Sequence, residues 1–120
     1  MAEYVDGFLV AVPKKNLAKY KKVARLFGKV CREHGAIEVR ECVGDDVTKG
    51  KLTSFPRALL LKRGEVVVFS YIVYKSRKAR DSANKKIMSD PRVAGAMNGE
   101  DMPFDGARMI WGGFQTLLRA

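Results

Sequence analysis

The chain has 120 residues, 47% of them hydrophobic, and its 23 Lys and Arg against 13 Asp and Glu give a formal charge of +10 at pH 7. This length fits one domain, 1–120. No stretch approaches the roughly 20 consecutive apolar residues that a membrane span needs, so a membrane-spanning helix is not expected. The charge favours acidic partners in general, whether nucleic acid, anionic lipid or anionic metabolites, and does not choose among them. A basic surface that only keeps the protein soluble is the plain alternative.

Cysteine usage and the N-terminus indicate a cytoplasmic protein. Cys31 and Cys42 form neither a CxxC pair nor a zinc-binding spacing, so two buried, reduced thiols are expected. Glu3 and Asp6 occupy the place where a signal peptide carries basic residues. We expect no cofactor and no metal site, because the single histidine, His34, cannot build a multi-histidine centre.

The first strand is expected at 4–12, where both alternating faces are apolar. One face carries Asp6, Phe8, Val10 and Val12; the other carries Val5, Leu9 and Ala11. Pro13 ends this strand, and apolar residues at spacings of three and four then predict a helix over 15–34. Gly35 is a fitting C-terminal stop for that helix.

A second strand is expected at 36–43, with Glu41 on the same face as the apolar Ile37, Val39 and Val43. Residues 44–64 form a long, weakly patterned connection. A loop of that length in a compact domain is functional, part of an interface, or disordered.

The strongest strand signal is 65–74, Glu-Val-Val-Val-Phe-Ser-Tyr-Ile-Val-Tyr. Both faces are mostly apolar, so both need cover. Small and β-branched side chains suit a closely docked helix, whereas aromatic rings suit a wider space. We therefore expect Val66, Val68, Ser70 and Ile72 to face the helices, and Val67, Phe69, Tyr71 and Val73 to face a partner.

The last third of the chain predicts a second helix from the N-cap Ser76 to about Ser89, a short turn of helix at 91–97 and a loop at 98–107. A final strand is expected at 108–118. Its two faces carry Met109, Trp111 and Leu117, and Ile110, Phe114 and Leu118.

The order strand, helix, strand, strand, helix, strand predicts an α+β, ferredoxin-like fold with a four-stranded antiparallel sheet. Right-handed crossovers place both helices on one face of the sheet, with the first and third strands central. The other face is then an apolar patch too large to leave in water. We therefore expect a homodimer whose two sheets pack face to face as a dimeric α+β barrel.

Five segments of the chain have distinctive sequences: Tyr4-Val5-Asp6-Gly7-Phe8, Glu41-Cys42-Val43-Gly44-Asp45-Asp46, Thr53-Ser54-Phe55-Pro56, Met102-Pro103-Phe104-Asp105-Gly106 and Arg108-Met109-Ile110-Trp111-Gly112-Gly113-Phe114. With these segments the chain resembles, over nearly its whole length, the YbaA-like family of small bacterial proteins of unknown function. The resemblance implies the dimeric α+β-barrel superfamily, which includes small monooxygenases and haem-degrading enzymes. It implies no catalytic residues, so whether the protein is an enzyme stays open.

Three residues are candidates for proton-transfer chemistry: Asp6, Glu41 and His34. Asp6 and Glu41 are acids on otherwise apolar strand faces, where a carboxylate must be paired or have a raised pKa. They are either general bases or members of structural ion pairs, for instance with Arg40 or Arg108. His34 is either a proton carrier or simply a basic residue favoured at a helix C-terminus.

Phe69, Tyr71 and Trp111 are the candidate binding residues, lining a space between two sheets together with Tyr4 or Phe8. Ordinary core and interface packing is the alternative. The resemblance to the dimeric α+β-barrel superfamily implies a protein that binds or converts a small apolar or aromatic molecule in an inter-sheet pocket of a homodimer. The second hypothesis is non-specific RNA binding by a basic helix face that carries Lys19, Lys22, Arg25, Lys29 and Lys78.

Overall fold

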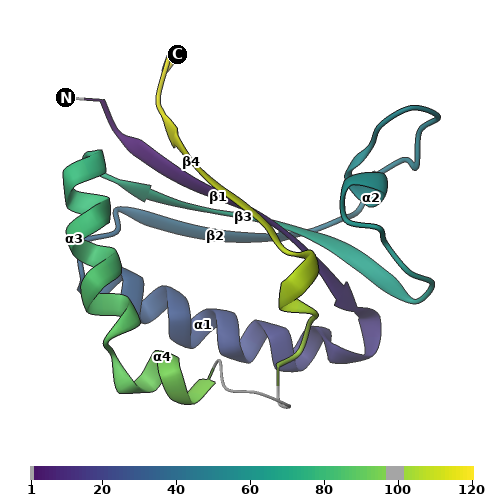
Figure 1. Ribbon diagram of the computed structural model, residues 1–120, viewed down its shortest axis with the longest axis horizontal. Helices are drawn as coiled ribbons and strands as arrows, with labels where there is room; N and C mark the ends of the chain where they lie inside the picture. Colours follow the sequence, from purple (N-terminus) through teal and green to yellow (C-terminus); the bar gives the residue numbers. More distant parts are fainter. Residues whose placement is uncertain (1, 97–101) are drawn as a thin grey trace.

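The computed structural model describes residues 2–96 and 102–120, and it shows an antiparallel sheet with its main helices on one face (Figure 1). In chain order the elements are β1 (Tyr4–Pro13), η1 (Lys14–Asn16), α1 (Leu17–Glu33), β2 (Glu38–Val43), α2 (Phe55–Ala58), β3 (Glu65–Tyr74), α3 (Arg77–Met88), α4 (Pro91–Ala96), η3 (Gly106–Arg108) and β4 (Ile110–Gln115). Met97 and residues 98–101, on which part of the predicted helical turn and loop fall, lie outside the described residues.

The sheet has the strand order β2-β3-β1-β4, so β1 and β3 are central. This arrangement confirms the predicted ferredoxin-like topology. Each central strand has a hydrogen-bonded neighbour on both edges, so its backbone N–H and C=O groups are paired on both sides. The two edges of the sheet are β2 and β4 (Figure 1).

β3 presents the two faces that its alternation predicts. Val68, Ile72 and Tyr74 lie beneath the helices and are 2%, 4% and 0% exposed. Phe69 points to the opposite side and is 44% exposed. The helix-facing residues join two core clusters with Val30 of α1 and other apolar residues of the helices. The predicted distribution of side chains between the two faces of β3 is therefore confirmed.

The helices pack on the sheet through narrow apolar stripes. α1 buries Tyr20, Val30 and Cys31, and α3 buries Ala83 and Ile87. The side chain of Ser76 accepts a hydrogen bond from the backbone N–H of Ala79 and caps α3, as predicted. Each large apolar side chain removed from water in this layer contributes on the order of 1.5–3 kcal/mol.

The long connection 44–64 is partly ordered on the open face, the side of the sheet opposite α1 and α3. It contains the short helix α2, capped by Ser54, and it buries Leu59 against Ala11 and Val67. Val67 is therefore only 5% exposed within a single chain. The expectation that Val67 contacts a partner is wrong, because the protein's own Leu59 covers it.

The last strand is shorter than the predicted 108–118. Asp105 caps the 3-10 turn η3, and the Arg108 guanidinium donates hydrogen bonds to Glu65 and to the carbonyl oxygens of Leu59 and Leu60. Arg108 thus joins three segments of the chain. Pairing of β4 with β1 begins only at Ile110. None of the described helices is both long enough and apolar enough to cross a membrane.

Candidate functional site

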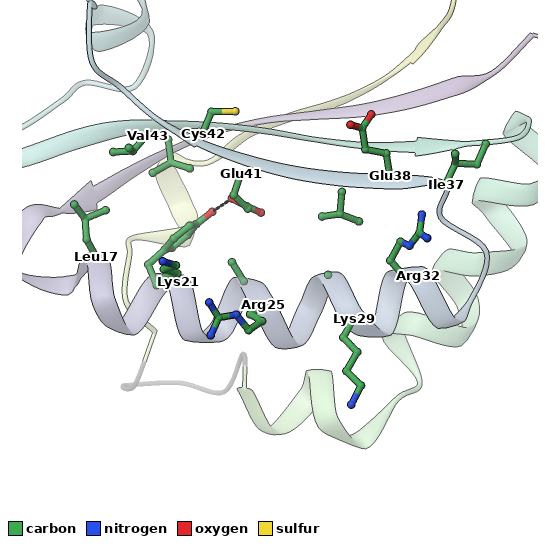
Figure 2. Close-up of a pocket in the computed structure, with 15 residues that line it drawn as sticks. Leu17, Lys21, Arg25, Lys29, Arg32, Ile37, Glu38, Glu41, Cys42 and Val43 are labelled. Atoms are coloured by element: carbon green, nitrogen blue, oxygen red, sulfur yellow. Dashed lines mark hydrogen bonds between the residues drawn. The ribbon is translucent and has the colours of Figure 1, made fainter.

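A groove of about 820 Å³ runs between α1 and β2. Its apolar lining comes from both elements and from β3: Leu17, Ala24, Gly28, Ile37, Val39, Val43 and Val68. Figure 2 shows the two walls, with β2 above and α1 below. The groove lies on the helix side of the sheet, so it is not the space between two sheets that is predicted to hold a ligand.

The groove exists because β2 is an edge strand with no further strand beyond it. Gly28 brings α1 close to β2, since a Cβ atom at this position would lie 3.4 Å from Cγ1 of Val39. The close approach of the Gly28 backbone to Val39 closes the bottom of the groove. Towards solvent, Ile37 and Val43 remain 45% and 55% exposed, which is unusual for large apolar side chains that line a hollow.

Glu41 points from β2 towards α1, and Tyr20 donates a hydrogen bond of 2.7 Å to its Oε1 atom (Figure 2). Burial of the Glu41 carboxyl against the apolar lining raises its pKa, and the Tyr20 hydrogen bond lowers it in part. Burial and the adjacent Glu41 also raise the pKa of Tyr20, which keeps that hydroxyl a donor. The pair is thus a fixed hydrogen-bond acceptor at one end of the groove.

A row of four cations follows α1 along the groove: Lys21, Arg25, Lys29 and Arg32. Among the residues that the structure describes, none of the four forms a salt bridge. Figure 2 shows that Arg32 reaches up towards Ile37, whereas Lys29 points away from the sheet. The acid on the facing wall, Glu38, is already paired with Arg40 at 2.7 Å. Arg32 is therefore the cation best placed to meet a molecule in the groove.

Asp6 lies elsewhere, in the core beneath the sheet, and is 2% exposed. Its partner is Arg80, whose Nε atom is 3.7 Å from Oδ1 of Asp6. Arg40 pairs with Glu38 and Arg108 with Glu65, so the prediction that either arginine pairs with Asp6 or Glu41 is wrong. Burial raises the pKa of Asp6, and Arg80 opposes that effect. Oδ1 of Asp6, Nε of Arg80 and the Tyr74 hydroxyl have no hydrogen-bond partner among the described residues.

His34 is the C-terminal cap residue of α1, and its Nε2 atom is 3.7 Å from Oδ2 of Asp90. Asp90 also pairs with Arg92, which in turn binds Glu33. His34 thus belongs to a surface network that joins α1 to α4. The structure does not bring it together with Asp6 or Glu41 in one site.

The candidate aromatic residues are divided between the two sides of the sheet. Phe69 and Tyr71 are in edge contact on the open face, with ring centroids 6.3 Å apart. Trp111 pairs in register with Phe8, which packs under the helices, and its ring lies 6.0 Å from the Arg80 guanidinium. The expectation that Trp111, Tyr4 or Phe8 lines an inter-sheet space is wrong, because these residues share the helix-facing side.

The two thiols also differ. Cys31 is fully buried, and burial raises its pKa to about 12. Cys42 is exposed on β2, so the prediction that both thiols are buried is wrong for Cys42. Within residues 2–96 and 102–120, no three His, Cys, Asp or Glu side chains gather as a possible metal site.

Sequence reasoning found Glu41 but missed Tyr20 and Arg32. Helical period alone places Tyr20 in an apolar stripe of the predicted helix and Arg32 on its basic side, and neither position indicates a site. Their positions relative to β2 could have been found by placing the helix over the edge strand, because Tyr20, Ala24 and Gly28 follow at spacings of four and share one side of the helix.

Comparison with known proteins identifies relatives over most of the chain. The family model described as DUF1428, protein of unknown function, matches residues 3–106. The chain is 47% identical over 116 residues to uncharacterized protein YbaA of Escherichia coli strain K12, covering 97% of each chain. The same identity and coverage hold for the protein of that name from Shigella flexneri.

Two solved structures share the fold at low sequence identity. A dimeric ferredoxin-like protein from an uncultured marine organism is similar with a TM-score of 0.63 at 8% identity, over 100% of both chains. Rv0793 from Mycobacterium tuberculosis is similar with a TM-score of 0.60 at 12% identity, over 99% of both chains. These similarities agree with the ferredoxin-like architecture of the sheet and helices.

Proposed function

We propose that this chain, which belongs to the DUF1428 family of proteins of unknown function, binds a small, largely apolar molecule in the groove between α1 and β2. The observation that carries the proposal is the groove itself, with an apolar lining and a volume of about 820 Å³. Small-molecule sites have volumes of roughly 300–1,000 Å³ and are lined mainly by apolar side chains with a few fixed polar groups. The Glu41–Tyr20 pair and the row of cations are such groups.

We also infer that the protein acts as a homodimer. Its open sheet face carries Phe69, Ile110 and Phe114, which are 44%, 40% and 62% exposed in a single chain. A solved protein with this fold is described as dimeric. Pairing through the open face would leave the groove accessible, because the groove lies on the helix side.

The ligand proposal is tested with anilinonaphthalene sulfonate, an aromatic dye with one anionic sulfonate group, which brightens when its rings leave water. We expect the native protein to bind it and Gly28→Leu to weaken binding at least about tenfold, because the added side chain occupies the groove beside Val39. Ala18→Leu is the matched control, since Ala18 is exposed on α1 and does not line the groove.

Circular dichroism establishes whether both variants are folded. A second blocking variant, Val43→Arg, places a long side chain at the exposed rim, so the test does not depend on Gly28 alone. Dye binding that is equal in native protein, Gly28→Leu and Val43→Arg would overturn the groove as the binding site.

A further inference from the structure

We propose that the groove recognises an elongated molecule with two polar ends: an anionic group that binds Arg32, and a hydroxyl or N–H donor that binds Glu41. This inference rests on the small-molecule function proposed above and names the chemical class of the ligand. It follows from the different polar groups at the two ends of one apolar groove.

At the first end, Glu41 has an acceptor to spare. Tyr20 donates to Oε1 at 2.7 Å, and Oε2 accepts no hydrogen bond from the described residues. The groove lining on this side includes the apolar Leu17, Val43 and Val68 and also the cations Lys21 and Arg25 of α1. A carboxylate held in such surroundings repels an anionic group and accepts a hydrogen bond strongly from a hydroxyl or N–H.

At the second end, Arg32 lies beside Ile37 and has no acidic partner in the described part of the chain. Its guanidinium can hold a carboxylate or phosphate through two parallel hydrogen bonds. Lys29, one turn earlier on α1, adds positive charge at this end. Arg32 lies at the end of the groove away from Glu41 (Figure 2), so an anionic group bound there is attracted by the guanidinium and avoids repulsion by the Glu41 carboxylate.

The spacing of the two ends sets the length of the molecule. Tyr20 and Arg32 are separated by about 18 Å along α1, at a rise of about 1.5 Å per residue. The Arg32 side chain reaches towards Ile37, at the end of the groove away from Glu41 (Figure 2). A rod of two aromatic rings with a polar group at each end fits this separation, and its body lies over Gly28 and Val39.

The test compares three probes that differ only at their ends: para-hydroxybiphenyl carboxylate, biphenyl carboxylate and para-phenylphenol. Affinities are measured by calorimetry and NMR shift perturbation. We expect the two-ended probe to bind the native protein about tenfold more tightly than either one-ended probe, because each end adds one charge-assisted hydrogen bond.

The variants separate the two ends. Glu41→Met should remove the advantage of the hydroxyl group and leave biphenyl carboxylate unaffected. Arg32→Met should remove the advantage of the carboxylate and leave phenylphenol unaffected. Lys22→Met is the control, because Lys22 is exposed on α1 and does not line the groove.

The outcomes distinguish this inference from the function on which it rests. If probes bind and Gly28→Leu blocks them, but either end variant behaves like Lys22→Met, the groove is a binding site and the two-ended recognition is wrong. If no probe binds and the dye is unaffected by Gly28→Leu, both proposals fail.

Discussion

At the scale of single residues, Gly113 on β4 is a tightly packed position. A Cβ atom there would lie 2.5 Å from the Tyr4 hydroxyl and 2.8 Å from Nη2 of Arg80. Tyr4 accepts a hydrogen bond from this nitrogen at 3.1 Å, and Arg80 is the partner of the buried Asp6. Because Gly113 has no side chain, it leaves room for Tyr4 and for Arg80, and Arg80 offsets the charge of the buried Asp6.

We expect Gly113→Ala to lower the free energy of unfolding by about 1–3 kcal/mol, because overpacking displaces Tyr4 or Arg80. Thermal and urea unfolding measure the change. Gly95→Ala is the control: a Cβ atom at Gly95 meets nothing within 4 Å, so this variant should be neutral or slightly stabilising. Equal stability of the two variants would show that the strand tolerates a side chain beside Arg80.

At the scale of elements, Arg108 joins the start of β3, the 3-10 turn η3 and the segment that follows α2. Its guanidinium hydrogen-bonds to both oxygens of Glu65, to Asp105 and to the Leu60 carbonyl. Leu60 has a positive φ of 51°, which a non-glycine residue adopts only when its surroundings hold it. Arg108 supplies part of that support, and it keeps Leu59 seated on the open face.

The Arg108 hydrogen bonds lower the pKa of Glu65 to about 2. Because the folded-state pKa lies below the unfolded value of 4.5, this pair stabilises the fold above about pH 4.5, and its contribution is lost as pH falls towards about 2. We expect Glu65→Gln to cost about 1–3 kcal/mol at pH 7 and much less at pH 2, measured by urea unfolding.

The control for this prediction is Glu38→Gln. Glu38 pairs with Arg40 at the surface, where the Arg40 side chain is 61% exposed, and such pairs contribute about 0–1 kcal/mol. A Glu65→Gln cost that does not change between pH 7 and pH 2 would mean that the Glu65 charge does not stabilise the fold.

At the scale of the whole molecule, the proposed homodimer depends on the open sheet face. Phe69 and Tyr71 form an aromatic surface there, and Phe55 of α2 extends it, with its ring centroid 6.4 Å from that of Phe69. A stable interface buries about 800 Å² per partner. A second copy that brings the same face satisfies this requirement by two-fold symmetry.

We expect the native protein to sediment as a dimer at micromolar concentration and Phe69→Lys to dissociate it, because the lysine would be an unpaired charge between two apolar sheets. Val68→Lys is the contrasting variant. Val68 is 2% exposed beneath the helices, so that change should unfold each subunit from within. A native monomer, or a folded Phe69→Lys variant that stays dimeric, would place the interface elsewhere or remove it.

Local pattern in the sequence determined the elements, their order and the faces of β3. Alternation and helical period are properties of neighbouring residues, and the core requires every apolar face to be covered. The exact bounds of β3 and the Ser76 cap could therefore be predicted, and so could the central positions of β1 and β3. The burial of Asp6 followed in the same way from its apolar neighbours on the strand.

Only the tertiary structure decided which distant groups meet. Asp6 pairs with Arg80 because α3 crosses beneath β1. Alternation within β4 separates its two faces but does not say which face lies under the helices. The pairing of Trp111 with Phe8 places Trp111 on the helix-facing side. The groove also depends on contacts between segments that are distant in the sequence. Glu41 and Tyr20 lie on separate elements, and their hydrogen bond depends on the close approach of α1 to the edge strand at Gly28. A pattern along one strand or helix carries no information about that distance.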